Sequence, residues 1–364
     1  MLDVLITSNY QISMNTRALL AILIIAALSF SCSSRDDDGN SAANIDCLNL
    51  GNQEFNITIQ ESFTTLPSKV SVFFKVNGND GSPVAGLTPS NFTIFEQGRN
   101  DDCYNEISNS EASSTISPNA QIFSNNTLLV LDLSNSVLST SLQELKQASS
   151  SFISNVMPSI PTASFKMAIY WFDGENILHE LQPLTTSATM LQEAINGITE
   201  DISNDPSTDL YGAVIKATDI AQHIIDSSEN EELFAAVSVV LFTDGTDQAA
   251  RFTEEEAITA VNDADDDINF FTIGLGSEID EDVLSKIGQT ESVFASNATE
   301  LETVFNDISN GVAGQANSFY LFEYCSPKRD GSGMNNLVIQ VINGNQDGIV
   351  QTSFDATGFT SGCE

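Results

Sequence analysis

The stretch at residues 126–136 constrains the fold more than any other part of the sequence. It begins with a short apolar run, 128–131, and such a run between polar residues is typical of a strand buried on both faces. The run ends in the pattern Asp132-x-Ser134-x-Ser136, whose side chains point to one side while the backbone stays extended. Ligands of open α/β sheets bind at the carboxyl ends of strands, and three oxygen donors there suit a small divalent cation. The alternative interpretation is a serine-rich loop that binds no metal.

Strand-like and helix-like segments alternate from residue 121 to residue 316. This alternation predicts an α/β fold, namely a doubly wound, mostly parallel six-stranded sheet with helices on both faces. A second buried strand, at 235–242, is followed by Asp244, and Thr208 stands just before a helical pattern at 210–225. These two positions add a carboxylate and a hydroxyl to the oxygen donors of the first stretch.

The set Asp132, Ser134, Ser136, Thr208 and Asp244 resembles, in this order and context, the metal-ion-dependent adhesion site of the von Willebrand factor type A domain. The resemblance covers roughly residues 121–316 and fills all five positions of the family's motif. It implies that the three hydroxyls bind Mg²⁺ (or Mn²⁺ or Ca²⁺) directly, while the two aspartates act largely through water. Neutral hydroxyls leave the charge of the ion poorly neutralised. An open coordination position would then attract an acidic side chain from a protein or extracellular-matrix ligand.

The charge of the chain excludes some classes of partner. Its 364 residues include 50 acidic and only 12 basic ones, a formal net charge of −38. Nucleic acids and anionic membrane surfaces are therefore poor direct partners. No H-E-x-x-H, G-x-S-x-G or G-x-x-x-x-G-K-[ST] motif occurs. The two histidines, His179 and His223, are interpreted as tolerated surface residues, and the chain is not expected to be an enzyme.

The N-terminus has the pattern of an export signal. Residues 1–31 read as a signal peptide, with Met14 as an alternative start because a basic residue follows it closely and an apolar run of 11 residues comes next. Cys32 resembles the lipidated cysteine of a bacterial lipobox, and 32–46 reads as an acidic flexible tether similar to the export signal of Bacteroidetes lipoproteins. These patterns predict an exported protein, lipid-anchored in the outer membrane and exposed at the surface. Plain secretion is the alternative.

Two β-rich segments flank the α/β region, at 47–120 and 317–364. Short alternating strands separated by turns predict a β-sandwich-like region built from both flanks. Four cysteines lie in these flanks, and in an exported chain an even number suggests disulfides. The sequence leaves the pairing open: each flank could hold its own disulfide, or the two flanks could be linked to each other. The candidates are Cys47, Cys103, Cys325 and Cys363.

These features together predict a cell-surface binding or adhesion protein that recognises its ligand through the bound cation. A first alternative is an assembly or scaffolding module of the envelope in which the metal is structural. A second alternative, ranked last, is a metal-dependent hydrolase, because the motif offers no second metal and no evident general base.

Overall fold

The computed structural model describes residues 45–48, 50, 53–98, 100–117, 123–231, 233–328, 333–360 and 363. The predicted signal peptide, Cys32 and nearly all of the predicted tether lie outside the described residues. Among the residues described, no helix is long and apolar enough to span a membrane.

The α/β region contains a six-stranded sheet with the strand order β11-β10-β9-β6-β7-β8. All neighbouring strands are parallel except β8, which pairs antiparallel with β7 at one edge. The predicted doubly wound, mostly parallel sheet is therefore confirmed. Its strands are β6 (Phe123–Asp132), β7 (Phe165–Phe172), β8 (His179–Thr185), β9 (Phe234–Thr243), β10 (Ile268–Leu275) and β11 (Glu291–Ala295).

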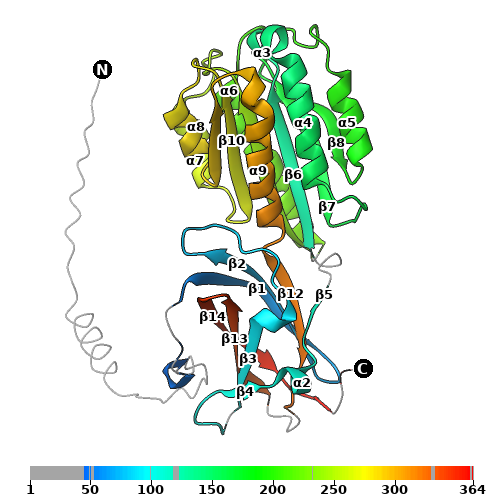
Figure 1. The fold of residues 1–364 in the computed structure, drawn as a ribbon, viewed down its shortest axis with the longest axis vertical. Helices are drawn as coiled ribbons and strands as arrows, with labels where there is room; N and C mark the ends of the chain where they lie inside the picture. Colours follow the sequence, from blue (N-terminus) through cyan, green and yellow to red (C-terminus); the bar gives the residue numbers. More distant parts are fainter. Residues whose placement is uncertain are drawn as a thin grey trace, which may run out of the picture. The chain divides into compact units, whose positions relative to one another are not determined.

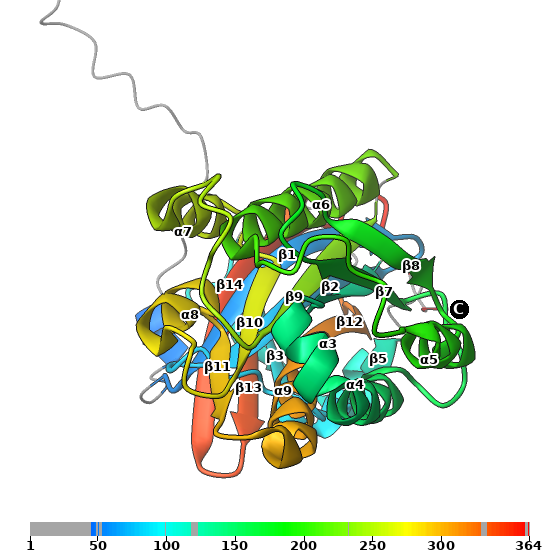
Figure 2. The same cartoon turned by 90° about the horizontal axis from the view of Figure 1, so that it is seen from above.

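Helices cover both faces of this sheet (Figures 1 and 2). One face packs against α3, α4, α5 and α9, and the other packs against α6, α7 and α8. Because every residue of the central strand β6 is buried, its apolar run needs no alternation between polar and apolar positions. The helices are α3 (Asn135–Thr140), α4 (Leu142–Val156), α5 (Ala188–Gly197), α6 (Leu210–Asn230), α7 (Glu254–Asn262), α8 (Glu281–Ile287) and α9 (Leu301–Ala316).

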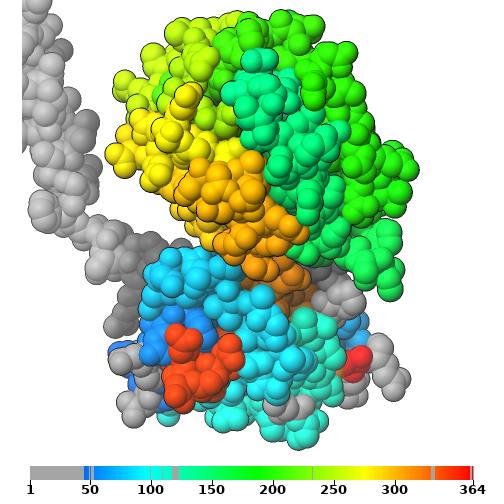
Figure 3. Space-filling view, turned by 45° about the horizontal axis from the view of Figure 1, so that its top comes forward, coloured from blue at the N-terminus to red at the C-terminus, as the bar shows by residue number. Residues whose placement is uncertain are grey.

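The flanking segments combine into two four-stranded sheets, β1-β2-β12-β5 and β14-β13-β3-β4. Each sheet contains strands from both flanks, since β12 pairs with β2 and β13 pairs with β3. In Figure 3 the red atoms of the C-terminal strands lie among the blue and cyan atoms of the N-terminal ones. The strands are β1 (Phe55–Thr65), β2 (Lys69–Gly78), β3 (Phe92–Gln97), β4 (Asn105–Ile107), β5 (Thr115–Ser117), β12 (Phe319–Cys325), β13 (Met334–Asn343) and β14 (Gln346–Asp355), with a short helix α2 (Asn109–Ala112) between β4 and β5.

Both disulfides lie within one flank each. Cys47 is bonded to Cys103, and Cys325 is bonded to Cys363. Of the pairings that the sequence left open, the structure therefore has the one in which each flank is closed by its own disulfide. The two flanks are held to each other by strand pairing and by their shared apolar core rather than by a covalent bond.

A small aromatic cluster connects the β-sandwich with the α/β region. Phe73 of β2 is fully buried and contacts Phe123, Phe234 and Phe319, with ring centroids 5.4, 5.1 and 5.8 Å away. Phe123 and Phe234 begin β6 and β9, the two central strands of the parallel sheet. The amino ends of these strands are therefore packed against the sandwich, while their carboxyl ends are free to form a site.

Candidate metal centre at the carboxyl edge of the sheet

Asp132 is the last residue of β6 and lies beneath the candidate centre. Its side chain is 0% exposed. One carboxylate oxygen, Oδ1, accepts a hydrogen bond from the backbone N–H of Ser134 at 2.9 Å, and the other, Oδ2, accepts one from the hydroxyl of Thr243 at 2.6 Å. The first bond fixes the turn between β6 and α3, which orients the following serines. The second bond connects β6 with β9 across the sheet.

Ser134, Ser136 and Asp244 come together at this edge. The hydroxyl oxygens of Ser134 and Ser136 are 3.2 Å apart, and the hydroxyl of Ser136 donates to Oδ1 of Asp244 at 2.8 Å. Ser134 is the cap residue of α3, and Asp244 follows the last residue of β9. Because β6 and β9 are adjacent and parallel, their carboxyl ends meet at one edge of the sheet. Figure 1 shows the end of β6 at this edge, beneath α3.

Thr208 belongs to the same edge. It is 2% exposed and lies two residues before α6. Its carbonyl oxygen accepts hydrogen bonds from the N–H groups of Gln248 and Ala249 at 2.8 and 3.1 Å. A β-carbon built on Gly245, the residue after Asp244, would lie 4.0 Å from the Thr208 hydroxyl oxygen. The structure thus brings all five residues of the motif to one locality, although Thr208 makes no direct hydrogen bond to the other four.

Burial raises the pKa of both carboxyl groups. The pKa of Asp132 is raised to about 6, chiefly because the group is desolvated; the hydrogen bond from Thr243 lowers it and the charge of Asp244 raises it further. The pKa of Asp244 is also raised, again chiefly by burial and in part by the charge of Glu278, while the Ser136 hydrogen bond lowers it. Among the described residues, neither aspartate forms an ion pair with a lysine or arginine.

This donor set fits a hard divalent cation. It provides two carboxylates without a positive partner and three hydroxyls, and such ions take oxygen ligands of this kind. A cation at this edge would compensate the negative charge of the Asp132 carboxylate, whose pKa is raised chiefly by burial. A shallow cavity of about 290 Å³ adjoins Ser136 and Asp244, and Glu278 and Asn297 also line it. A side chain from another molecule could therefore approach the two motif residues from solvent.

Two further groups near this edge lie outside the five-residue motif. The Thr243 hydroxyl holds the buried Asp132 carboxylate, and only its position directly before Asp244 could have indicated this role. Asp173, which follows β7, is also fully buried. Its Oδ2 atom accepts hydrogen bonds from the Ser203 hydroxyl at 2.8 Å and from the N–H groups of Asn204 and Asp205, each at 3.2 Å. It therefore anchors the loop that leads to Thr208.

An α/β domain with a doubly wound, mostly parallel sheet and helices on both of its faces belongs to the Rossmann-like class of domains. Residues 126–309, just over half of the chain, match the family model of the von Willebrand factor type A domain. The chain therefore belongs to this family. No curated protein sequence gives a significant match to it.

Several solved structures have a similar fold. A conserved hypothetical protein, BatB of Bacteroides thetaiotaomicron, is 16% identical with a TM-score of 0.41 over 52% of this chain and 98% of its own. Proximal thread matrix protein 1 of the mussel byssus, with a zinc-occupied MIDAS motif, is 14% identical with a TM-score of 0.42, over 53% of this chain and 48% of its own. Manganese-loaded TRAP of Plasmodium vivax is 12% identical with a TM-score of 0.41, over 68% and 97%. These similarities concern the fold alone.

Proposed function

We propose that this chain is a cell-surface binding protein rather than an enzyme, and that it recognises a protein or extracellular-matrix ligand through a divalent cation. In this proposal Asp132, Ser134, Ser136, Thr208 and Asp244 hold Mg²⁺, with Mn²⁺ or Ca²⁺ as alternatives. The observation that carries it is the convergence of these residues from three separate segments, with one fully buried carboxylate, Asp132, and one partly buried carboxylate, Asp244, neither of which has a basic partner among the described residues.

The role of each group follows from its position. Asp132 is fully buried, and in this proposal it acts on the ion indirectly, through the neighbouring groups that it orients. Ser134 and Ser136 present neutral oxygens, which leave most of the cation's charge uncompensated. An acidic side chain of the ligand supplies the missing negative charge. Glu278 lies beside Asp244, and its negative charge repels the acidic side chain of the ligand unless the cation is bound. Recognition of the ligand therefore depends on the metal.

The location of the protein is part of the same proposal. Export through the signal peptide at 1–31 and lipidation of Cys32 would attach the chain to the bacterial outer membrane with its α/β domain outward. Replacing Cys32 with serine should abolish incorporation of radiolabelled palmitate and release the protein from the membrane fraction. Continued lipid labelling of the Cys32→Ser variant would contradict the anchor.

The experiment for the binding function compares the parent with Asp244→Ala, and Asp219→Ala serves as a matched control because Asp219 is exposed on α6. We expect Mg²⁺ to raise the melting temperature of the parent and of the control, but not of Asp244→Ala. Pull-downs of surface proteins from the native cells should lose the partner when EDTA is added and when Asp244 is replaced. Binding that survives EDTA would contradict metal-mediated recognition and favour a scaffolding module with a structural metal.

A further inference from the structure

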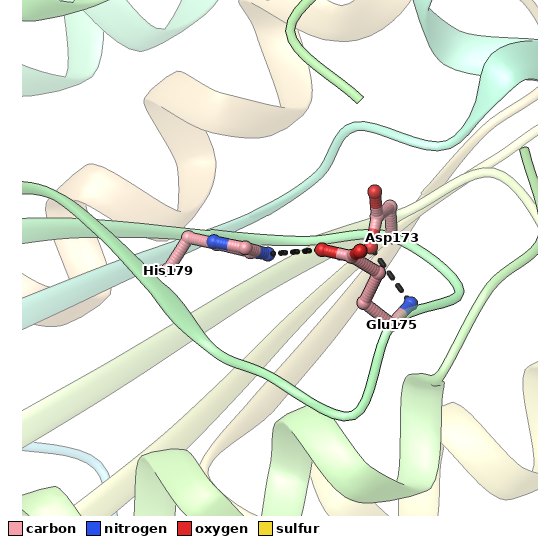
Figure 4. A group of neighbouring side chains, drawn as sticks. All are labelled: Asp173, Glu175 and His179. Atoms are coloured by element: carbon pink, nitrogen blue, oxygen red, sulfur yellow. Dashed lines mark hydrogen bonds and ion pairs between the residues drawn. The ribbon is translucent and has the colours of Figure 1, made fainter. Parts of the chain in front are cut away.

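A second cluster of metal-ligating side chains lies at the end of β7, outside the five-residue motif. It consists of Asp173, Glu175 and His179, and one ligand atom from each lies within 4.8 Å of the others. Figure 4 shows the His179 ring and the Asp173 side chain on either side of the Glu175 carboxylate. Asp173 follows β7 directly, Glu175 lies in the tight connection, and His179 begins the antiparallel strand β8.

His179 is held with one ring nitrogen facing this cluster. Its side chain is 23% exposed, but the Nε2 atom is shielded from solvent and has no hydrogen-bond partner. Oε2 of Glu175 lies 3.4 Å from this nitrogen, without hydrogen-bond geometry. The imidazole stacks on Trp171 with ring centroids 4.0 Å apart and planes 10° apart, which fixes its orientation. A buried polar atom without a hydrogen-bond partner is costly, so this nitrogen is suited to bind a metal ion.

Asp173 provides a rigid carboxylate without a cationic partner. Its side chain is 0% exposed, and the loop that contains Ser203 holds its Oδ2 atom with three hydrogen bonds. Its Oδ1 atom accepts one bond, from the N–H of Glu175 at 2.8 Å, which leaves a second lone pair. No described lysine or arginine forms an ion pair with Asp173; nearby Arg251 instead donates to the carbonyl oxygen of Gly174 and pairs with Asp209.

We propose that Asp173, Glu175 and His179 form a second metal site, which binds Zn²⁺. One imidazole and two carboxylates are a mixed nitrogen and oxygen set, which suits Zn²⁺ better than the hard ions Mg²⁺ and Ca²⁺. The cation gives the His179 nitrogen its missing partner and compensates the buried charge of Asp173. The hydrogen bonds around Asp173 act as the outer shell that orients a metal ligand. This site does not depend on the proposed binding function.

Zn²⁺ titration of the full chain, followed by isothermal calorimetry in chelator-free buffer, tests this site. The parent is compared with His179→Phe, which keeps an aromatic ring against Trp171 but removes the nitrogen. His223→Phe is the matched control, because His223 is the other histidine of the chain and is exposed on α6. Loss of even an outer-shell partner lowers metal affinity about 10–100-fold, so we expect His179→Phe to weaken Zn²⁺ binding by about 100-fold or more.

The parent and His179→Phe are each titrated a second time in a version that also carries Asp244→Ala, because Zn²⁺ could bind the first centre as well. Asp244→Ala should lose the response to Mg²⁺ and keep the His179-dependent Zn²⁺ site. X-ray absorption of the Zn²⁺-loaded Asp244→Ala protein should show one imidazole ligand. If His179→Phe does not fold, Glu175→Gln gives the same readout at a partly exposed position. Zn²⁺ binding that is unchanged by His179→Phe or Glu175→Gln, or abolished by Asp244→Ala alone, would overturn the proposal without affecting the first centre.

Discussion

Replacing Asp132 with asparagine should stabilise the protein when no divalent cation is present. Burial raises the pKa of this carboxyl group to about 6 from 3.8, the value of an ordinary aspartate. At pH values above 6 the folded chain must keep a desolvated charge that the unfolded chain solvates freely. The difference of about two pKa units corresponds to about 3 kcal/mol. Asparagine keeps the shape of the side chain and an acceptor for the Ser134 N–H. Its amide nitrogen cannot accept from Thr243, but it can donate to the Thr243 hydroxyl, which then donates to the carbonyl oxygen of Gly245 at 3.3 Å, so the substitution removes most of this cost.

The pH dependence has a defined sign. Since the folded pKa lies above the unfolded one, the stability of the parent falls as the pH rises from about 4 to 6 and is then level. The advantage of Asp132→Asn should therefore be about 3 kcal/mol at pH 7.5, about half of that at pH 5, and close to zero at pH 3.5. Urea unfolding in EDTA, followed by circular dichroism over this range, measures the difference directly.

Adding Mg²⁺ should nearly cancel the stability advantage of Asp132→Asn over the parent. A ligand at 100 times its dissociation constant stabilises a folded protein by about 2.7 kcal/mol, and this gain should appear in the parent and be lost or much reduced in Asp132→Asn. Asp219→Asn, on the exposed side of α6, should follow the parent under all conditions. The reasoning is refuted if Asp132→Asn is less stable than the parent in EDTA at pH 7.5, or if Mg²⁺ stabilises both equally.

Three further perturbations concern the β-sandwich and its junction with the α/β region. Phe73→Ala should lower the free energy of unfolding by about 3–5 kcal/mol, because Phe73 is fully buried among three other rings; a loss below 1 kcal/mol in urea unfolding would contradict this packing. Opening the Cys325–Cys363 disulfide with Cys363→Ser should cost about 2–4 kcal/mol, and peptide mapping without reductant should recover this pair in the parent. Tyr324→Phe should cost about 1–3 kcal/mol by removing the buried hydrogen bond from the Tyr324 hydroxyl to Glu96; an unchanged urea midpoint would show that this bond contributes nothing.

The α/β fold could be predicted because its signals are local. The apolar run of β6 and the alternation of strands and helices fix the sheet. The proximity of Ser136 and Asp244 follows from the same logic, since Ser136 lies in the first turn of the helix after β6, Asp244 directly follows β9, and these two strands are neighbours in the sheet. The short alternating strands of the two flanks predict a β-sandwich-like region built from both of them, and the pairing of β12 with β2 and of β13 with β3 agrees with this prediction.

The cluster around His179 could not be predicted, because it depends on the register of a hairpin. Trp171 and His179 are opposite each other where β7 pairs with β8, and the register of this pair shifts twice. Periodicity in the sequence does not determine such shifts, and a change of one residue would turn His179 to the other face of the sheet. The sequence therefore favoured a tolerated surface histidine, whereas the structure has a stacked, half-buried ring beside two carboxylates.

The position of Thr208 shows how an irregular loop becomes a rigid part of a site. The loop before it is fixed at 203–205 by the carboxylate of Asp173. The next residue, Asp209, donates its N–H to the carbonyl oxygen of Asp173 at 2.9 Å, and the carbonyl of Thr208 itself accepts from Gln248. The backbone of Thr208 is thus fixed by hydrogen bonds in the folded protein, so a cation does not have to order the loop when it binds. Pre-organisation of this kind strengthens binding because the conformational entropy is already lost in the folded protein.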